Sequence, residues 1–428
     1  MERLSLAGIR ILDLSRVWAG PYGTRLLADI GAEVIKVEAP GSWDLLRSLS
    51  LLSQNEHERV YNKSSYFNHY NRNKYDCAID LSHPKGRELA LRLVALSDVV
   101  IENYRADVLE KLDLTYEMLR SVRPDIILVS MPSHGLWGPD AHRIAYGTQI
   151  EQLAGLVSLT GYPDGPPQRS AIAYGDPVAG AMAAAATIAA LLYRRWTGRG
   201  QHVEVAQWEA FLPIVGEFFV EYTMTGPSPE GPPRLGNRHS SMAPHGLYPC
   251  ADDDSRAEGE SASGGWVAIA VGSDDEFSSL CHVIGQTELA RVPRFADVVS
   301  RHRHQDELDV IVSAWTTEQT HTEAAAQLQA AGVPAMPVLT IPELMADAHL
   351  AERGLWEEVA HREAGTWTMD GPLCRFERTP AHVRLPAPCF AEHNDYVLGD
   401  LLGLSDEEIA ELEREGVTAR EPVPGQDE

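Results

Sequence analysis

The chain has few cysteines and no pattern among them. They are odd in number, widely scattered and form no CxxC pair: Cys77, Cys250, Cys281, Cys374 and Cys389. Disulfide frameworks of secreted domains and structural zinc sites need an even or closely spaced set. We therefore expect free, buried thiols and a reducing compartment, which favours a cytoplasmic protein.

Long apolar runs are also lacking. The first sixteen residues do not contain the apolar stretch of about 7–15 residues that a secretory signal requires. The most apolar segment, 178–193, is shorter than the roughly 20 residues that span a bilayer, and alanine dominates it. It predicts a tightly packed internal helix, and we expect no membrane partner.

Basic charge is scarce. The chain has 36 Lys and Arg against 62 Asp and Glu, a formal net charge of −26. Nucleic acid is an improbable partner, because its binding depends on a basic surface. A phosphorylated cofactor is not excluded, since its site needs only a local cluster of donors. His302 and His304 are the closely spaced histidines, and the arginines beside them indicate a solvated helix start, so no metal is predicted.

The N-terminal third alternates between strand and helix patterns. Parallel strands follow from such alternation, so we expect an α/β fold with a Rossmann-like, doubly wound sheet. The residues between the first strand and helix, 16–23, lack the GxGxxG fingerprint, which disfavours a nicotinamide cofactor although Glu38 ends the second strand. The expected strands are 9–14, 33–37, 98–102 and 125–130, and the expected helices are 22–30 and 86–96.

The second half of the chain has a different composition. A Pro/Gly-rich stretch at 225–233 indicates a turn or linker, and 251–265 reads as an exposed acidic loop of unassigned role. A strand at 266–271 and helices at 276–284 and 321–331 predict a smaller α+β domain. Ser405 and Glu408 form a capping box that predicts a helix at 406–415. We expect a large domain over 1–200, a linker over 201–225, the small domain over 226–339, and a return segment over 340–428 that completes the large domain.

Asp176 is the most informative single residue. It precedes Pro177 and an alanine-rich segment that ends at Gly198, which predicts a helix with Asp176 as its N-cap. A carboxylate at a helix N-terminus is stabilised as an anion, and an unperturbed Asp, with a pKa of about 3.9, is ionised at neutral pH. Such a group can attack a thioester without a separate base. Gly175 and Gly180 are expected to leave room for a ligand.

Several short motifs, in order, carry a family resemblance over nearly the whole chain. With them the chain resembles the class III CoA-transferases, the CaiB/BaiF-like group that includes formyl-CoA transferase, crotonobetaine CoA-transferase and α-methylacyl-CoA racemase. The motifs lie at 6–14, 19–21, 31–38, 71–74, 102–105, 175–180, 197–201, 236–239, 331–334, 392–395 and 402–405.

The resemblance implies a site and an assembly. The family's catalytic aspartate falls on Asp176, which forms a mixed anhydride with the acyl group and then an aspartyl-CoA thioester. Coenzyme A thioesters are substrates, with no permanently bound cofactor, and the protein is expected to be an interlocked homodimer of ring-like subunits. The positions that contact coenzyme A fall on Trp18, Ala19, Ala39, Asn103, Tyr104, Lys111 and Tyr146.

Three departures from formyl-CoA transferase disfavour formyl and oxalyl substrates. That enzyme has glutamine at the position of Trp18 and a basic residue near Ala39. Its glycine-run loop has no counterpart around 231–239.

Two alternatives remain open. A racemase exchanges an α-proton between two bases and has histidine where this chain has Tyr146, whose pKa of about 10 suits that exchange poorly. A non-catalytic acyl-CoA-binding protein would not need Asp176.

The donor and acceptor acids are not fixed by the sequence. Trp18, Tyr22, Trp43 and Tyr146 are expected to surround the thioester with aromatic rings, which suits a bulky or aromatic acyl group. The segment 145–151 is similar to that of benzylsuccinate CoA-transferases, which draw on succinyl-CoA.

Overall fold

The computed structural model describes residues 4–49, 59–226, 233–251 and 265–423. The chain forms two units, each with its own core. The larger unit comprises 1–157, 169–227 and 350–428, and the smaller comprises 158–168 and 228–349. Most of the Pro/Gly-rich stretch at 225–233 and of the acidic loop at 251–265 lies outside the described residues. Residues 201–225, expected to be a linker, form β6 (His202–Glu204), α9 (Gln207–Phe211) and α10 (Gly216–Thr225).

The larger unit is built on a six-stranded parallel sheet, which confirms the predicted fold class. Its strand order is β3-β2-β1-β4-β5-β6. From β1 the chain adds β2 and β3 on one side of the sheet, and then β4, β5 and β6 on the other side, all of them parallel. The strands are β1 (Arg10–Asp13), β2 (Glu33–Glu38), β3 (Lys74–Ala78), β4 (Val99–Glu102), β5 (Ile127–Ser130) and β6. Each expected strand is present, and β3 and β6 are additional.

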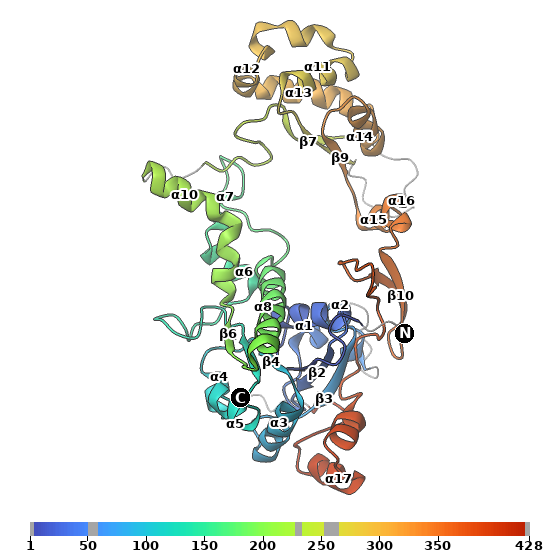
Figure 1. The fold of residues 1–428 in the computed structure, drawn as a ribbon. Helices are drawn as coiled ribbons and strands as arrows, with labels where there is room; N and C mark the ends of the chain where they lie inside the picture. The colour runs from blue at the N-terminus through green and yellow to red at the C-terminus, as the bar shows by residue number, and fades with distance from the viewer. Residues whose placement is uncertain (1–3, 50–58, 227–232, 252–264, 424–428) are drawn as a thin grey trace. The chain divides into compact units, whose positions relative to one another are not determined.

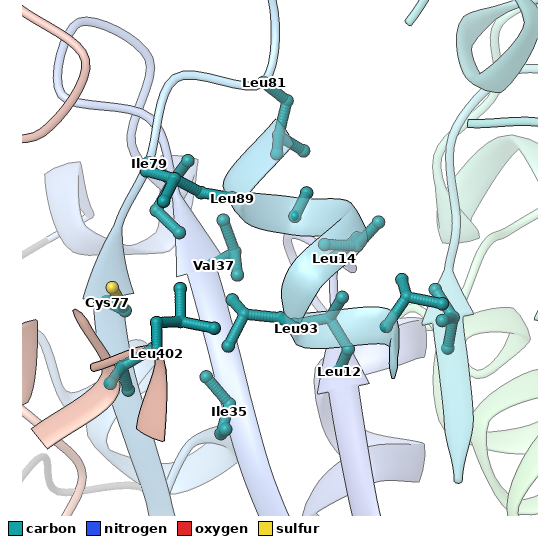
Figure 2. Close-up of a cluster of buried hydrophobic side chains, with 14 of the residues drawn as sticks. Leu12, Leu14, Ile35, Val37, Cys77, Ile79, Leu81, Leu89, Leu93 and Leu402 are labelled. Atoms are coloured by element: carbon teal, nitrogen blue, oxygen red, sulfur yellow. The ribbon is translucent and has the colours of Figure 1, made fainter. Parts of the chain in front are cut away.

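Apolar side chains cover both faces of this sheet. On one face Leu12 and Ile35 pack with α3 (Pro84–Leu96) and with Leu402 from the C-terminal segment (Figure 2). On the other face Ile11 and Val99 pack against α1 (Ala19–Asp29) and α8 (Gly175–Thr197) (Figure 1). The strand order reverses between β1 and β4. In sheets of this type ligands bind in the crevice at the carboxyl ends of the two strands that flank such a reversal.

The helices α1 and α8 approach closely because glycines face each other. A Cβ on Gly23 would lie 2.7 Å from the carbonyl oxygen of Gly180, and one on Gly180 would lie 2.4 Å from that of Ala19. A Cβ on Gly175 would meet the carbonyl of Gly147 at 3.0 Å. The expectation that Gly175 and Gly180 leave room for a ligand is therefore wrong, because protein backbone already occupies that space.

The ends of α8 follow local rules only in part. Gly198 ends the helix in the left-handed conformation at φ 72°, as predicted. Among the described residues α8 is the one helix that is long and apolar enough to cross a membrane. The core helix of a soluble protein can have the same length and composition. Its inner face, from Ala179 to Leu191, is buried against the larger unit.

The smaller unit has a three-stranded antiparallel sheet in the order β7-β8-β9. Its strands are β7 (His245–Pro249), β8 (Trp266–Ala270) and β9 (Ala335–Val338), and its main helices are α11 (Asp274–Val283), α12 (Val298–Arg303), α13 (Gln305–Thr316) and α14 (His321–Ala330). Tyr248, Val267 and Phe277 anchor its core.

After the smaller unit the chain returns to the larger one. It adds the hairpin β10 (Trp356–His361) and β11 (Gly365–Asp370), and then α17 (Asp406–Arg414). The capping box of Ser405 and Glu408 at the start of α17 is present as predicted. Both ends of the chain thus contribute to the larger unit.

Candidate active site

Asp176 is the second residue of α8, and Tyr174 is the residue that caps this helix. The prediction of Asp176 as the N-cap is wrong, because α8 already begins at Gly175. The carboxylate of Glu151, on another helix, accepts the backbone N–H of Tyr174 at 2.6 Å. Within the part of the chain that the structure describes, no side chain caps the start of α8, so the carboxylate of Asp176 is available to groups from other elements.

Two backbone N–H groups lie near the carboxylate of Asp176 and act to lower its pKa. They belong to Ala19, the first residue of α1, and to Gly147, the first residue of α6 (Gly147–Leu153). Three helix N-termini, those of α1, α6 and α8, therefore meet at this carboxylate. Each N-terminus carries partial positive charge and unpaired N–H groups, which is the arrangement that holds an anion.

The carboxylate is nonetheless difficult to ionise. Asp176 is 9% exposed. Its pKa is raised to about 7, mainly by burial and to a smaller extent by the negative charge of Glu151, while the N–H groups of Ala19 and Gly147 act in the opposite direction. The sequence-based expectation of an unperturbed carboxylate is therefore wrong, because burial outweighs the stabilisation by the helix N-termini.

Glu151 is a functional candidate that the sequence reasoning did not assign. It is completely buried on α6. Besides the N–H of Tyr174, it accepts the hydroxyl of Ser170 at 2.9 Å, and so holds both ends of the segment that leads into α8. The mostly polar sequence of α6, GTQIEQL, gave no local signal that Glu151 would be buried.

Trp18 and Ala19 lie at the start of α1, and the N–H of Ala19 lies near the carboxylate of Asp176. The ring of Trp18 stacks on that of Tyr70 at 5.1 Å and meets the edge of Tyr66 at 5.9 Å. Tyr22 meets the edge of the same Tyr70 at 6.2 Å. Both partners come from α2 (Ser65–Tyr70), which the sequence analysis did not predict.

The other two aromatic residues expected near the thioester do not join this cluster. Trp43 stacks on Tyr61 at 5.4 Å in a separate apolar cluster. Tyr146 precedes Gly147 and is 54% exposed. Of the four rings, the structure brings together those of Trp18 and Tyr22.

Asn103 ties the end of β4 to the turn after β1. Its amide oxygen accepts the N–H of Arg16 and its amide nitrogen donates to the carbonyl of Arg16, both at 2.8 Å. Its neighbour Tyr104 packs against the sheet core, and burial raises the pKa of its hydroxyl to about 12. These contacts lie at the crevice between β1 and β4.

The remaining two predicted positions are Ala39, which follows β2, and Lys111, which lies on a short helix. Ala39 follows β2 and forms an isolated bridge with Ser42. Lys111 ends the short helix α4 (Val108–Lys111), pairs with Asp107 at 2.6 Å, and has a side chain that is 66% exposed. Two cavities of about 490 and 420 Å³ lie within the smaller unit, and no predicted site residue lines either one.

Beneath the turn after β1 lies a buried network of charges. Lys74 donates to Asp13 at 3.1 Å, and Lys36 donates to Asp44 at 2.9 Å. Burial lowers the pKa of Lys74 to about 8, with Lys36 adding to the effect. Burial also acts against the charge of Lys36, but Asp44 and Asp13 outweigh it and hold its pKa above the usual range. Lys36, which lies between the apolar residues Ile35 and Val37 of β2, was the sequence signal.

The model of CoA-transferase family III matches residues 6–394. A Chloroflexus aurantiacus protein named succinyl-CoA–D-citramalate CoA-transferase is 34% identical over 96% of this chain and 98% of its own length. The chain therefore belongs to CoA-transferase family III and is a CoA-transferase.

Further relatives agree with this assignment. The chain is similar to an Agrobacterium fabrum protein named succinate–glutarate CoA-transferase, with 33% identity over 92% of this chain and 95% of that protein. The solved structure of a CaiB/BaiF family protein from Brucella suis matches with a TM-score of 0.82 and 31% identity, over 94% of this chain and all of that one. Both the sequence motifs and the fold thus support family membership.

Proposed function

We propose that this protein transfers coenzyme A between carboxylic acids through covalent intermediates on Asp176. The observation that carries the proposal is the setting of this carboxylate. It is buried where the N-termini of three helices meet, with Gly147 packed against it and the N–H groups of Ala19 and Gly147 near enough to lower its pKa. A buried carboxylate with raised basicity is a better nucleophile than a solvated one, and its ionised form requires no base.

The reaction proceeds in four balanced steps. A carboxylate oxygen of Asp176 attacks the thioester carbon of the donor, and the carbon–sulfur bond breaks to release the CoA thiolate and leave a mixed anhydride. The thiolate attacks the aspartyl carbonyl carbon, which releases the donor acid as a carboxylate and gives an aspartyl-CoA thioester. The acceptor carboxylate displaces the thiolate to form a second anhydride. Attack of the thiolate on the acceptor's acyl carbon gives the new acyl-CoA and restores Asp176.

The N–H groups of Ala19 and Gly147 have a second role in this mechanism. When thiolate or acceptor attacks the aspartyl carbonyl, negative charge develops on an oxygen of Asp176. These two N–H groups already lie near the carboxylate, so they can stabilise that oxyanion without a large rearrangement. Removing one such donor from an oxyanion hole typically lowers kcat by about 10²–10³.

The proposed contacts to coenzyme A are the backbone of Trp18, Ala19 and Ala39, together with Asn103 and Tyr104. They follow β1, β2 and β4, whose carboxyl ends share one edge of the sheet. Lys111 lies on exposed α4 and supplies a cation suited to a phosphate, and Tyr146 flanks the proposed nucleophile.

As donor we propose succinyl-CoA, with a dicarboxylic acid as acceptor. The two relatives described above are named for succinyl-CoA or succinate paired with D-citramalate or glutarate. The test is a panel of acceptor acids assayed with succinyl-CoA and with acetyl-CoA. Transfer from succinyl-CoA to dicarboxylates, with little transfer from acetyl-CoA, is the expected result, and the reverse preference would reject the proposed donor.

The two alternatives to transfer lack support. A racemase needs a second base at the position of Tyr146, which carries an exposed tyrosine. A non-catalytic binding protein gives no role to a buried carboxylate with a raised pKa. Deuterium exchange at the α-carbon of a 2-methylacyl-CoA, without transfer of CoA, would favour the racemase.

We also propose a homodimer located in the cytoplasm. Large apolar side chains are exposed on the outer face of α8 and on α10, among them Trp196, Tyr222 and Met224 at 76%, 60% and 79%. Such a concentration is typical of a surface covered by a partner. The cysteines of the described chain are free, and all but Cys374 are buried, which suits a reducing compartment.

A further inference from the structure

Val17 has a backbone conformation that its side chain disfavours. It lies in the turn between β1 and α1 with φ at 66°, in the left-handed region. A β-branched residue is a genuine outlier there, because its Cβ substituents crowd the following carbonyl. Such strain persists only where the surroundings over-determine the conformation, and it gathers at functional sites.

The side chain of Asp44 restrains this turn directly. Its two carboxylate oxygens accept the N–H of Val17 at 3.1 and 3.2 Å. One residue earlier, Asn103 binds both the N–H and the carbonyl of Arg16. The turn is therefore fixed by side chains from two other parts of the chain.

Asp44 is itself held by a buried cation. Lys36 donates to Oδ2 of Asp44 at 2.9 Å and to the carbonyl of Ser15 at 2.8 Å, so it connects Asp44 to the start of the turn. Both charged side chains are completely buried. A buried ion pair rarely stabilises a fold more than apolar residues of similar size would. We therefore assign the pair of Lys36 and Asp44 a role in the geometry of the turn.

The turn leads directly to the proposed nucleophile. Trp18 and Ala19 follow Val17, and the N–H of Tyr22 donates to the carbonyl of Trp18 at 2.8 Å, which begins α1. The start of α1 packs closely against α8, because a Cβ on Gly180 would lie 2.4 Å from the carbonyl oxygen of Ala19. The N–H of Ala19 lies near enough to the carboxylate of Asp176 to act on its pKa. A change of φ at Val17 would therefore move the start of α1 and this donor together.

We propose that Asp44, supported by Lys36, is a positioning residue that holds Val17 in its left-handed conformation and thereby places the N–H of Ala19 against Asp176. The inference rests on the proposed role of Asp176 in CoA transfer. Asp44 acts through the backbone of the turn and contacts no reacting atom in this scheme.

The test is a double-mutant cycle between Asp44→Asn and Val17→Gly. The Asn variant places an NH₂ group against Lys36 and Val17, so the turn relaxes and kcat for succinyl-CoA-dependent transfer is expected to fall by about 10²-fold, with KM changing less. Glycine adopts positive φ without strain. In the presence of Val17→Gly, the same change at Asp44 should therefore lower kcat by less than about tenfold.

A purely structural role for Asp44 would not show this rescue. Equal losses of kcat with and without Val17→Gly would overturn the proposal. If Asp44→Asn does not fold, Lys36→Met combined with Asp44→Asn removes the ion pair as a whole, and the cycle with Val17→Gly is measured in that background. Full activity of the folded Lys36→Met/Asp44→Asn protein would equally overturn the proposal.

The proposed function is checked separately, through the activity of Asp176→Asn in the wild-type background. If that variant lacks activity but no rescue occurs, the positioning role alone is rejected. If that variant still transfers CoA, the role of Asp176 is rejected whatever the Asp44 variants do.

Discussion

A Cβ atom on Gly147 would lie 1.9 Å from Oδ2 of Asp176 and 2.6 Å from its Cγ. The absence of a side chain at Gly147 thus lets the first turn of α6 bring its N–H to the carboxylate. We predict that Gly147→Ala displaces either the helix or Asp176 and lowers kcat by on the order of 10²-fold, as misplacement by about 1 Å does elsewhere.

The matched control is Gly399→Ala. Gly399 is also helical, and its added Cβ would meet neighbours at 3.9 Å or more. It should retain kcat within a few-fold, and both variants should retain wild-type circular dichroism. Near-wild-type kcat for Gly147→Ala would show that the carboxylate tolerates displacement, against the proposed oxyanion role.

A second prediction concerns Glu151, whose negative charge raises the pKa of Asp176. Glu151→Gln keeps an acceptor for Tyr174 while removing that charge, so the pKa of Asp176 should fall. In a plot of kcat/KM against pH, the acidic limb of the variant should lie at lower pH than that of the wild type, by roughly half to one pH unit. Tyr70, whose pKa Asp176 helps to raise, is unchanged in this comparison.

Glu117→Gln, at an exposed position of α5 (Tyr116–Val122), is the control for loss of a carboxylate. Its acidic limb should coincide with that of the wild type. A shift of the Glu151→Gln limb to higher pH would contradict the electrostatic role assigned to Glu151.

A third prediction links the pKa of Asp176 to stability. The pKa is about 7 in the folded protein against 3.8 for an unperturbed Asp, so the folded state binds the proton more tightly. This contribution to the free energy of unfolding is complete below the unfolded pKa and is lost as the pH rises through about 7. The loss is on the order of 2–4 kcal/mol.

Asp176→Asn should therefore stabilise the protein in a pH-dependent way. Asparagine resembles the protonated acid, so the variant and the wild type should have similar Tm near pH 4, whereas near pH 8 the variant should melt higher by about 2–4 °C. Thermal unfolding monitored at both pH values provides the measurement. A Tm difference that does not change with pH would show that the carboxylate is not destabilised by burial.

A fourth prediction concerns assembly. If the exposed apolar residues of α8 and α10 are covered by a second copy, the protein should sediment as a dimer that does not dissociate on dilution. Tyr222→Glu should weaken this association, and Glu221→Gln, on the same helix, should not. A native-like monomer that appears on dilution of the wild type, with unchanged circular dichroism, would rule out interlocking.

The sheet could be predicted from local patterns. The strands around Ile11, Val34 and Val99 are short apolar runs, and the segments between them include residues with helical spacing. The structure has strands and helices at these positions. The box of Ser405 and Glu408 was likewise predictable, because its hydrogen bonds join residues three positions apart.

The parts of the site that were missed depend on contacts between distant residues. Glu151 accepts the N–H of Tyr174 at the start of α8 from another helix, and burial, which no local pattern records, changes the pKa of Asp176. Lys36 and Asp44 are charged, a property that normally indicates exposure. Their pairing beneath a strained turn follows only from the assembled sheet.

The most direct measurement of the central claim is covalent capture of the intermediate on Asp176. The wild type is incubated with succinyl-CoA and hydroxylamine, digested, and examined by mass spectrometry. Anhydride and thioester intermediates both react with hydroxylamine at the aspartyl carbonyl, so the expected product is a hydroxamate at Asp176, dependent on succinyl-CoA and absent from Asp176→Asn. A hydroxamate at another carboxylate, or transfer of CoA by Asp176→Asn at near the wild-type rate, would contradict the account.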